Sequence, residues 1–479
     1  MKLPRIILLT LFVTTSFFAF SQLPNILLII SDDMGVDATN GYDLGDVNPT
    51  TPNIDSLMAN GLKFNNAWAT AVCAPTRATI MSGKYPSKTG VLTVPGHLDT
   101  AHTSIFKHID TITNGAYADA VIGKWHLAEP LDVTHPAQHG VDMFAGVQGG
   151  GVGNYSFWNR TENDTTSLTT DYITTWLTDK AIDWIDTQHS QNQPWFLWWS
   201  HVAPHTPIHL PPDSLYTFAD TATDLGKYMA MIESLDHEIG RLLNSMSQGQ
   251  RDSTLIIFIG DNGTPGGTIQ DYPPFRAKGS LFQGGIHVPM VASGYGVTRI
   301  GEEENALVNV IDIHATLMEV VGADLPGGVY NSLSFKHLLT GSTGATRHFN
   351  FTEGTGSGEG DYAIRTPEYK LITLQDSTQR YYFIQDDTLE ENGLFQGGLT
   401  AEEDSVKTVL EAEALILQTS WSCNDFIQNG DEEGIDCGGS FCTPCPVDSC
   451  ANDTIPPIIF NCPPDITIGN DSGECSTIV

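Results

Sequence analysis

The chain has 479 residues, 40% of them hydrophobic, and its formal net charge at pH 7 is −35. The hydrophobic share is enough to bury a large core, which excludes a wholly disordered acidic chain. The charge argues against duplex nucleic acid or an anionic membrane face as a partner, because both require basic surface. An anionic small substrate stays compatible if a local cluster of cations meets it.

Residues 1–21 have the pattern of a secretory signal peptide. Basic residues come first, residues 6–20 form a short apolar run, and Ala19 and Ser21 place small residues before a cleavage point. An uncleaved anchor is the alternative, but the run is short for a membrane span. We therefore expect a secreted, periplasmic or cell-surface protein with no transmembrane segment after signal removal.

Apolar runs of strand length alternate with helix-like stretches from residue 24 to about 340. This alternation predicts an α/β fold in which helices flank a mostly parallel central sheet. Runs that are apolar on both faces are typical of central parallel strands. The four clearest runs are residues 25–31, 119–123, 195–200 and 254–259. The aromatic run within 195–199 could be a sugar platform, but a buried strand is the preferred interpretation.

Residues 227–246 have helical periodicity and belong to the main unit. The later part of the chain predicts a smaller unit, with two strand-like pieces at Tyr362–Arg365 and Tyr381–Ile384. A helix-like stretch at 402–418 follows. We therefore expect a small antiparallel sheet with one helix after the main sheet.

Polar and charged residues follow each of the four apolar runs. Because ligands of open α/β sheets bind outside the carboxyl ends of the strands, these residues are predicted to form one site. In chain order they are Asp32 and Asp33; Lys124 and His126; His201 and His205; and Asp261, Asn262 and Gly263.

The oxygen ligands in this set favour a hard divalent cation. The carboxylates of Asp32, Asp33 and Asp261 and the amide of Asn262 suit calcium or magnesium, whereas zinc prefers nitrogen and sulfur. Asp261 to Gly263 alone could be an ordinary turn. Its combination with the first Asp pair favours a metal site that holds calcium or magnesium.

A lone cysteine begins the segment CAPTR at Cys73. Pro75 suits the first turn of a helix and Gly83 its end, so Cys73 is expected at a helix N-terminus, where anions and thiolates are favoured. A buried structural cysteine is one alternative. A catalytic thiol with His205 or His126 as its base is another.

The pattern Cys73-x-Pro75-x-Arg77 resembles the signature of the formylglycine-dependent sulfatases, of the alkaline phosphatase superfamily. Thr76 stands where Ser or Ala is more usual. Residues 123–127 are similar to the family's G-K-W-H-L block.

Two later blocks extend the resemblance, which covers about residues 24–415. Asp261-Asn262-Gly263 is similar to the family's second metal block, and residues 277–285 to its lysine-bearing block. Gln283 and His287 stand where the family has Glu and Arg. The lysine of this block, Lys278, is present. Residues 361–395 resemble its C-terminal subdomain.

The resemblance implies a mechanism. A formylglycine-generating or anaerobic maturation enzyme would oxidise Cys73 to formylglycine (3-oxoalanine), whose hydrate attacks the sulfur of a sulfate ester. One divalent cation, usually calcium, would be held by Asp32, Asp33, Asp261, Asn262 and modified residue 73.

Further roles follow from the same resemblance. Arg77, Lys124 and Lys278 would neutralise the sulfate oxygens. His205, in preference to His126, would protonate the leaving oxygen. His201 is expected to be structural.

The last part of the chain differs in composition. Residues 420–479 contain ten acidic residues and no Lys or Arg, and they hold seven of the eight cysteines. An exported segment of this kind is typically stapled by disulfides, with zinc at Cys442-x-x-Cys445 as the alternative. Since seven is odd, at least one of these cysteines lacks a partner there.

These patterns give a provisional division. The expected units are a signal peptide at 1–21, a sulfatase catalytic domain at 22–340, its C-terminal subdomain at 341–419, a Cys-rich acidic module at 420–450 and the truncated start of a hyalin-repeat-like, immunoglobulin-like module at 451–479.

The sequence thus predicts a secreted sulfatase that acts on a sulfated carbohydrate or an aryl sulfate. One alternative is a phosphonate or phosphate monoester hydrolase of the same superfamily. The other is a catalytically silent carbohydrate-binding or adhesion protein, against which the complete Asp, Lys, His and Arg set argues.

Overall fold

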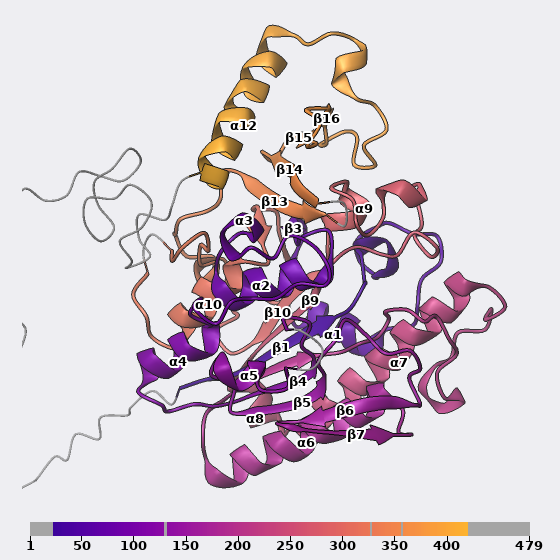
Figure 1. Cartoon of the computed structure of the whole chain (residues 1–479), viewed down its shortest axis with the longest axis vertical. Helices are drawn as coiled ribbons and strands as arrows, with labels where there is room; N and C mark the ends of the chain where they lie inside the picture. The colour runs from indigo at the N-terminus through magenta and orange to yellow at the C-terminus, as the bar shows by residue number, and fades with distance from the viewer. Residues whose placement is uncertain (1–22, 129–131, 326–327, 356–357, 420–479) are drawn as a thin grey trace, which may run out of the picture.

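A computed structural model describes residues 23–419 of the protein, apart from 129–131, 326–327 and 356–357 (Figure 1). The predicted signal peptide at 1–21 and the predicted modules at 420–450 and 451–479 lie outside the described residues. None of the described helices is long and apolar enough to cross a membrane.

A ten-stranded sheet forms the centre of the molecule. Its five middle strands, in the order β9-β1-β8-β4-β5, are parallel, and antiparallel strands join at β10 and β6. From edge to edge the strands are β11 (Glu302–Glu304), β2 (Gly61–Phe64), β10 (Met290–Gly294), β9 (Thr254–Gly260), β1 (Asn25–Ser31), β8 (Trp195–Ser200), β4 (Ala118–Lys124), β5 (Met143–Val147), β6 (Trp158–Glu162) and β7 (Thr165–Thr169). The predicted fold class is confirmed.

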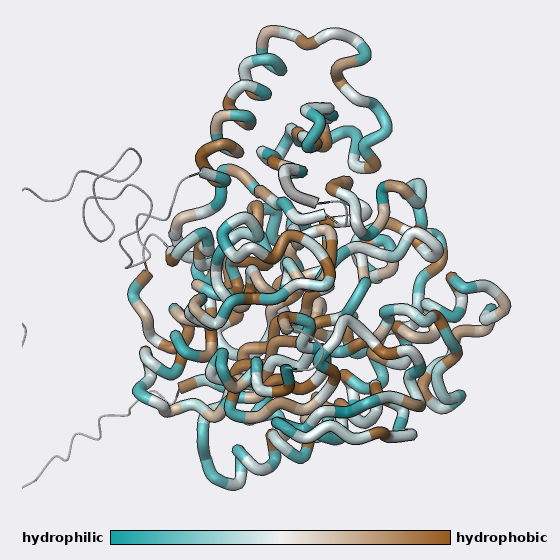
Figure 2. Tube along the Cα trace, viewed as in Figure 1, coloured by the Kyte–Doolittle hydropathy of each residue, from teal (hydrophilic) through white to brown (hydrophobic). Residues whose placement is uncertain are grey.

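Helices cover both faces of this sheet, and the strands supply alternate residues to each face. Along β1, Ile26 and Leu28 join one hydrophobic cluster, while Leu27 and Ile29 join the other. Burial on both faces explains why the sequences of these strands are continuous apolar runs. Figure 2 shows that hydrophobic residues, in brown, are concentrated in this central region. The predicted burial of 195–200 is confirmed, since every residue of β8 is buried.

The helices divide between the two faces as follows. Helices α6 (Ile173–Gln191) and α7 (Asp224–Ser245) pack on one face, and α2 (Cys73–Ser82), α4 (Ile105–Thr113) and α10 (Asp312–Val320) on the other. The remaining helices of the main unit are α1 (Pro52–Ala59), α3 (Pro86–Thr89), α5 (His135–Gln138), α8 (Gln248–Asp252), α9 (Gln283–Ile286) and α11 (Lys336–Thr340).

The smaller unit is an antiparallel sheet covered by one long helix, at the top of Figure 1. Its strands are β13 (Asn350–Thr355), β14 (Gly358–Arg365), β15 (Tyr369–Thr373) and β16 (Gln379–Phe383), and its helix is α12 (Ala401–Thr419). The short pair β3 (Ala67–Trp68) and β12 (Val308–Asn309) lies in the main unit.

Ten strands fall outside the predicted ones, namely β2, β3, β5, β6, β7, β10, β11, β12, β13 and β15. Strand β7 is mostly exposed, so it has no apolar run to mark it. Strands β13 and β15 are short and rich in polar residues, and their register comes from pairing across the small sheet. The helix predicted at 227–246 begins three residues earlier, where Thr223 caps the amide of Gly226.

Candidate active site

The predicted residues meet at the carboxyl ends of the parallel strands. Asp32 and Asp33 follow β1, Lys124 ends β4, and Asp261 and Asn262 follow β9. His126 follows β4, His205 lies in the loop after β8, and Cys73 and Arg77 come from the first turns of α2. The structure therefore brings the whole set to one edge, although their chemical roles stay predictions.

The three carboxylates of the site pair with its three cations. Lys124 Nζ lies 2.6 Å from Asp32 Oδ2, and Arg77 Nη2 lies 2.7 Å from Asp261 Oδ2. The ammonium of Lys278 donates to Asp33 Oδ1. Charges in a buried region are tolerated only when they are paired in this way.

Two side-chain oxygens in this cluster have no hydrogen-bond partner among the described residues. They are Asp32 Oδ1 and Asn262 Oδ1, and both are buried. Ligand atoms of Asp32, Cys73 and Asp261 lie within 4.8 Å of one another. Unpaired buried oxygens are costly unless a cation or donor meets them. The residues present therefore fit a hard divalent cation.

The electrostatics of the two neighbouring aspartates differ. Burial raises the pKa of Asp32, and the nearby Asp261 carboxylate adds to this. Burial acts on Asp33 in the same direction, but the positive charge of Lys278, together with that of His205 when it is protonated, outweighs it and holds the pKa of Asp33 below its usual range. Positive charge beside Asp33 thus keeps that carboxylate ionised.

Cys73 begins α2, as predicted, and its sulfur lies 3.2 Å from His126 Nδ1. Burial raises the pKa of the Cys73 thiol. Burial, with the positive charges of Lys124 and Arg77, lowers the pKa of His126 to about 2. A protonated thiol beside a neutral imidazole is a poor arrangement for a thiolate nucleophile, so these pKa shifts disfavour the catalytic-thiol alternative.

The two outermost groups of the site are His205 and Lys278, whose side chains are 19% and 20% exposed. His205 Nε2 lies 3.7 Å from Asp33 Oδ2, and its Nδ1 contacts the carbonyl of Thr206 at 2.7 Å. His201, in contrast, is fully buried with its ring against Trp199. Only the outer imidazole can therefore face an incoming substrate.

Two site residues have left-handed backbone conformations. Asp33 has φ 66° and His126 has φ 58°, which is uncommon for residues other than glycine. The amide of His126 donates to the carbonyl of Gln148 at 3.1 Å. Neighbouring segments thus hold the two residues in these conformations.

A glycine-rich segment, residues 149–153, closes one side of the site and was not among the predicted site residues. A Cβ on Gly150 would lie 2.7 Å from His126 Nε2, and one on Gly151 would lie 3.0 Å from His205 Nδ1. The backbone approaches both imidazoles so closely that side chains are excluded. The three consecutive glycines 149–151 and Gly153, which follow an apolar strand, were the available sequence signal.

The departures at Gln283 and His287 lie in packing contacts outside this cluster. Gln283 Oε1 accepts from Trp68 Nε1 at 2.9 Å, and His287 Nε2 contacts the carbonyl of Asn65 at 2.9 Å. They leave the contact between Lys278 and Asp33 intact.

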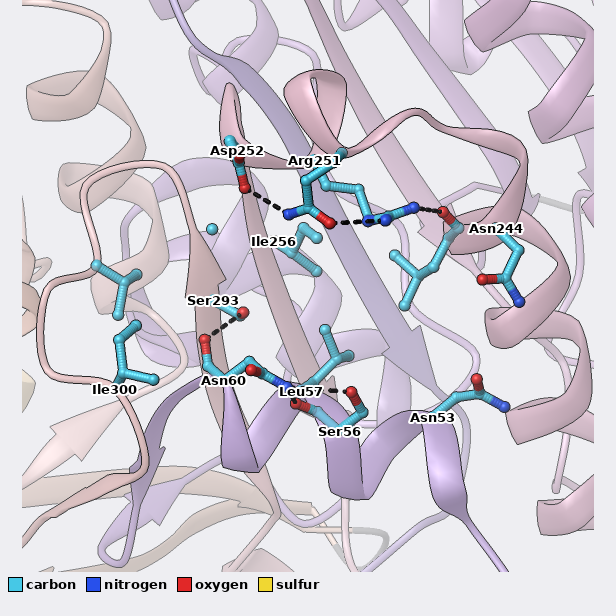
Figure 3. Close-up of a pocket in the computed structure, with 14 residues that line it drawn as sticks. Asn53, Ser56, Leu57, Asn60, Asn244, Arg251, Asp252, Ile256, Ser293 and Ile300 are labelled. Atoms are coloured by element: carbon cyan, nitrogen blue, oxygen red, sulfur yellow. Dashed lines mark hydrogen bonds between the residues drawn. The ribbon is translucent and has the colours of Figure 1, made fainter.

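A separate cavity of about 610 Å³ lies at the opposite, amino-end edge of the sheet (Figure 3). Its polar groups largely bond to one another or to the backbone: Gln248 donates to Asp252, Arg251 to the carbonyl of Leu243, and Ser293 to the carbonyl of Asn60. It has no group of the predicted site and is remote from it.

Comparison with known proteins adds independent information. The Sulfatase family model matches residues 24–323. N-acetylgalactosamine-6-sulfatase of Sus scrofa is 28% identical over 344 residues, a match covering 64% of this chain and 63% of that protein. Arylsulfatase A of Homo sapiens is 26% identical over 411 residues, covering 77% and 78%.

Solved structures agree with these matches. The crystal structure of Ps i-CgsB in complex with k-i-k-neocarrahexaose has a TM-score of 0.68 and 26% identity, covering 84% of this chain and 95% of that one. That chain shares its fold over nearly its entire length with the present protein.

Proposed function

Because the chain belongs to the sulfatase family, we propose that it hydrolyses sulfate esters of carbohydrates, with a formylglycine made from Cys73 and a bound calcium ion. The observation that carries the proposal is the buried cluster at the carboxyl edge of the sheet. There Asp32, Asp33 and Asp261 face Arg77, Lys124 and Lys278, with Cys73 among them.

The charge of this cluster supports an anionic substrate. Three carboxylates and three cations balance, so a divalent cation would leave the site positive and able to accept a sulfate ester. This gives a strongly acidic chain the local positive charge that such a substrate requires. A water-poor site strengthens these interactions.

The cation fits four side chains, Asp32, Asp33, Asp261 and Asn262, together with residue 73. When present, the formylglycine supplies an oxygen nucleophile and the cation favours its ionised form. The unpaired oxygens of Asp32 and Asn262 support this assignment. Asp33 Oδ1 already accepts from Asn262 Nδ2 at 2.8 Å, which orients the amide oxygen away from that contact.

Arg77 and Lys124 orient the inner part of the site. Arg77 donates to the carbonyl of Lys124 at 2.8 Å and also to Ser200 Oγ, so its guanidinium is fixed before substrate arrives. Lys124 and Lys278 present ammonium groups whose positive charge suits the non-bridging sulfate oxygens. Preorganised cations of this kind need no rearrangement during the reaction.

We assign the proton donor to His205. Its contact with the Thr206 carbonyl occupies Nδ1, so Nε2 is the nitrogen that can pass a proton to the leaving oxygen. His126 is mostly buried, and its Nδ1 lies against the sulfur of Cys73. The inner imidazole therefore suits a role in orienting residue 73.

The carbohydrate part of the proposal draws on the relatives, which include N-acetylgalactosamine-6-sulfatase and a structure in complex with k-i-k-neocarrahexaose. The matched segment spans 63% of the pig enzyme, so its substrate is not transferred. We propose sulfated carbohydrates as a class, and export of the protein through the signal-like residues 1–21.

The test is coexpression with a formylglycine-generating enzyme, followed by peptide mass spectrometry of residue 73 and an activity panel. The panel contains 4-nitrophenyl sulfate, a matching aryl phosphonate, N-acetylgalactosamine 6-sulfate, a carrageenan hexasaccharide and a galactose-based hexasaccharide with one terminal sulfate. We expect formylglycine at position 73 and sulfate release that the Cys73→Ala variant abolishes.

Each arm of the test can contradict a separate part of the proposal. An active enzyme with unmodified Cys73 would overturn the formylglycine mechanism. Faster turnover of the phosphonate would favour a phosphonate hydrolase. Absence of turnover on every ester, despite modification, would point to a binding protein.

A further inference from the structure

A groove of about 470 Å³ adjoins the glycine-rich segment beside the two imidazoles. Gly149 and Gly151 line it, and Gly151 is also the residue that lies against His205. Gly151 therefore lies next to both the groove and the outer imidazole of the site.

One face of the hairpin formed by β6 and β7 supplies most of the opposite wall. Side chains on a strand alternate between faces, and the register pairs Asn159 with Leu168 and Thr161 with Thr166. These four side chains thus share a face, and Phe157, in the bend just before β6, lines the same groove. All five line the groove, whereas Arg160 points to the other face, where it contacts Trp176.

The groove face combines apolar surface with hydroxyl and amide groups. Phe157 is 55% exposed and Leu168 is 57% exposed. Their packing does not require this exposure, and large apolar side chains that gather at the surface are typical of binding sites. Asn159 and Thr166 lie beside Leu168 on the same face of the hairpin. Sugar rings have apolar C–H faces and hydroxyl edges, and this wall matches both.

Gln148 adds a buried hydrogen-bonding group at the edge of the groove. The residue is 5% exposed, and its Oε1 has no hydrogen-bond partner among the described residues. The amide nitrogen of Gln148 donates to the carbonyl of Val133 at 3.4 Å, so the oxygen is the atom left to accept a bond from a hydroxyl in the groove. The backbone carbonyl of Gln148 meanwhile stays bonded to the amide of His126.

The residues that line the groove include no Lys, Arg, Asp or Glu. This contrasts with the sulfate-binding cluster, whose groups are mostly charged. A sulfate group in the groove would lose its hydration and would meet no cation in return. An unsulfated ring has no charge, so its loss of hydration would cost little free energy.

We propose that this groove is a sugar subsite that binds an unsulfated ring adjoining the sulfated one, with Phe157 as its apolar platform and Gln148 as its hydroxyl partner. The proposal rests on the proposed function, since it extends the substrate from a sulfate ester to an oligosaccharide of defined pattern. It makes Phe157 and Gln148 determinants of specificity and gives them no part in the chemistry.

The first test is calorimetric binding of an unsulfated galactose-based hexasaccharide to the full-length protein. We expect the wild type to bind, and Phe157→Ala and Gln148→Leu to weaken affinity by about tenfold or more, from lost apolar burial and a lost hydrogen bond. Phe395→Ala, at an exposed phenylalanine of the small unit, and Gln188→Leu, at a buried glutamine of α6, are the matched controls.

The second test compares kcat/KM for the singly sulfated hexasaccharide with kcat/KM for 4-nitrophenyl sulfate. We expect the groove variants to lower kcat/KM for the hexasaccharide about tenfold relative to kcat/KM for 4-nitrophenyl sulfate, because the aryl ester has no second ring. Thermal unfolding of each variant separates this effect from a general loss of fold.

The outcomes distinguish the two proposals. Absence of hexasaccharide binding by the wild type, or equal losses in groove and control variants, overturns the subsite, as does tighter binding of a hexasaccharide sulfated on every ring. Hexasaccharide binding that depends on Phe157, without hydrolysis of any sulfate ester, supports the subsite and overturns the sulfatase function instead.

Discussion

The hydroxyl of Tyr155 donates to the backbone carbonyl of His205 at 2.6 Å and lies 3.0 Å from the carbonyl of Val202. Tyr155 is buried just after the glycine-rich segment, so this contact ties that segment to the loop that carries the proposed proton donor. A change at Tyr155 should therefore reach the chemistry without touching the substrate.

We expect Tyr155→Phe to lower kcat for 4-nitrophenyl sulfate by about 3- to 10-fold and to cost about 1 kcal/mol of stability, the usual value of one buried hydrogen bond. Steady-state kinetics and urea unfolding measure the two effects. Tyr117→Phe, whose hydroxyl bonds to the Pro24 carbonyl before β1, is the control. An equal loss of kcat in both variants would contradict the positioning role.

The close approach of Gly150 to His126 gives a second prediction. A Cβ there would lie 2.7 Å from both Cε1 and Nε2 of the imidazole, so Gly150→Ala must displace one of them. We expect a loss of at least about tenfold in kcat/KM with little change in thermal unfolding. Gly249→Ala, where a Cβ would meet nothing within 4 Å, is the control. Wild-type activity in Gly150→Ala would show that the segment moves freely.

Asn262 tests the cation site. Its buried amide oxygen has no partner among the described residues, and Asn262→Leu keeps the volume while removing the ligand. We expect calcium, at a concentration of a hundred times its Kd, to raise the free energy of unfolding of the wild type by about 2.7 kcal/mol. The increase in the variant should be much smaller. Thermal unfolding with and without EGTA measures this. Asn244→Leu, in the remote cavity, should respond to calcium as the wild type does.

A buried ion pair of the small unit lies where that unit meets the main one. Lys370 Nζ pairs with Glu390 Oε1, both side chains are fully buried, and Glu390 Oε2 accepts from the amide of Gln283 at the start of α9. Lys370→Met should destabilise the protein by about 3–5 kcal/mol, because it leaves a buried charge unpaired. Adding Glu390→Gln should recover part of that loss in urea unfolding; no recovery would mean that the two residues act independently.

Asp119 predicts a pH dependence of stability. Burial raises the pKa of this carboxyl to about 8, although the amide of Asp142 donates to it. The native protein thus keeps a proton that the unfolded chain loses near pH 4, and stability falls as the pH rises from about 4 to 8. Asp119→Asn should raise Tm at pH 8.5 by at least about 3 °C and should have little effect near pH 3.5.

Differential scanning calorimetry between pH 3.5 and 9 checks this expectation, with Asp213→Asn as a control for loss of a surface charge. A Tm difference that is constant across the range would contradict a raised pKa at Asp119.

The sequence by itself determined the four adjacent central strands of the main sheet and the residues that meet at its carboxyl edge. Strands β1, β4, β8 and β9 are buried on both faces, so hydrophobicity alone marks them, and parallel topology then brings Asp32, Lys124, His205 and Asp261 to one edge. The apolar runs are local patterns in the sequence, and the meeting of the strand ends at one edge follows from a general rule of parallel sheets.

Only the tertiary structure decided which charges pair, which imidazole faces outward and where the groove runs. The contact of Arg77 with Asp261 joins residues 184 positions apart, and the β6–β7 hairpin has too little apolar pattern to be marked in the sequence. Such relationships depend on packing between distant segments, and no local periodicity records them.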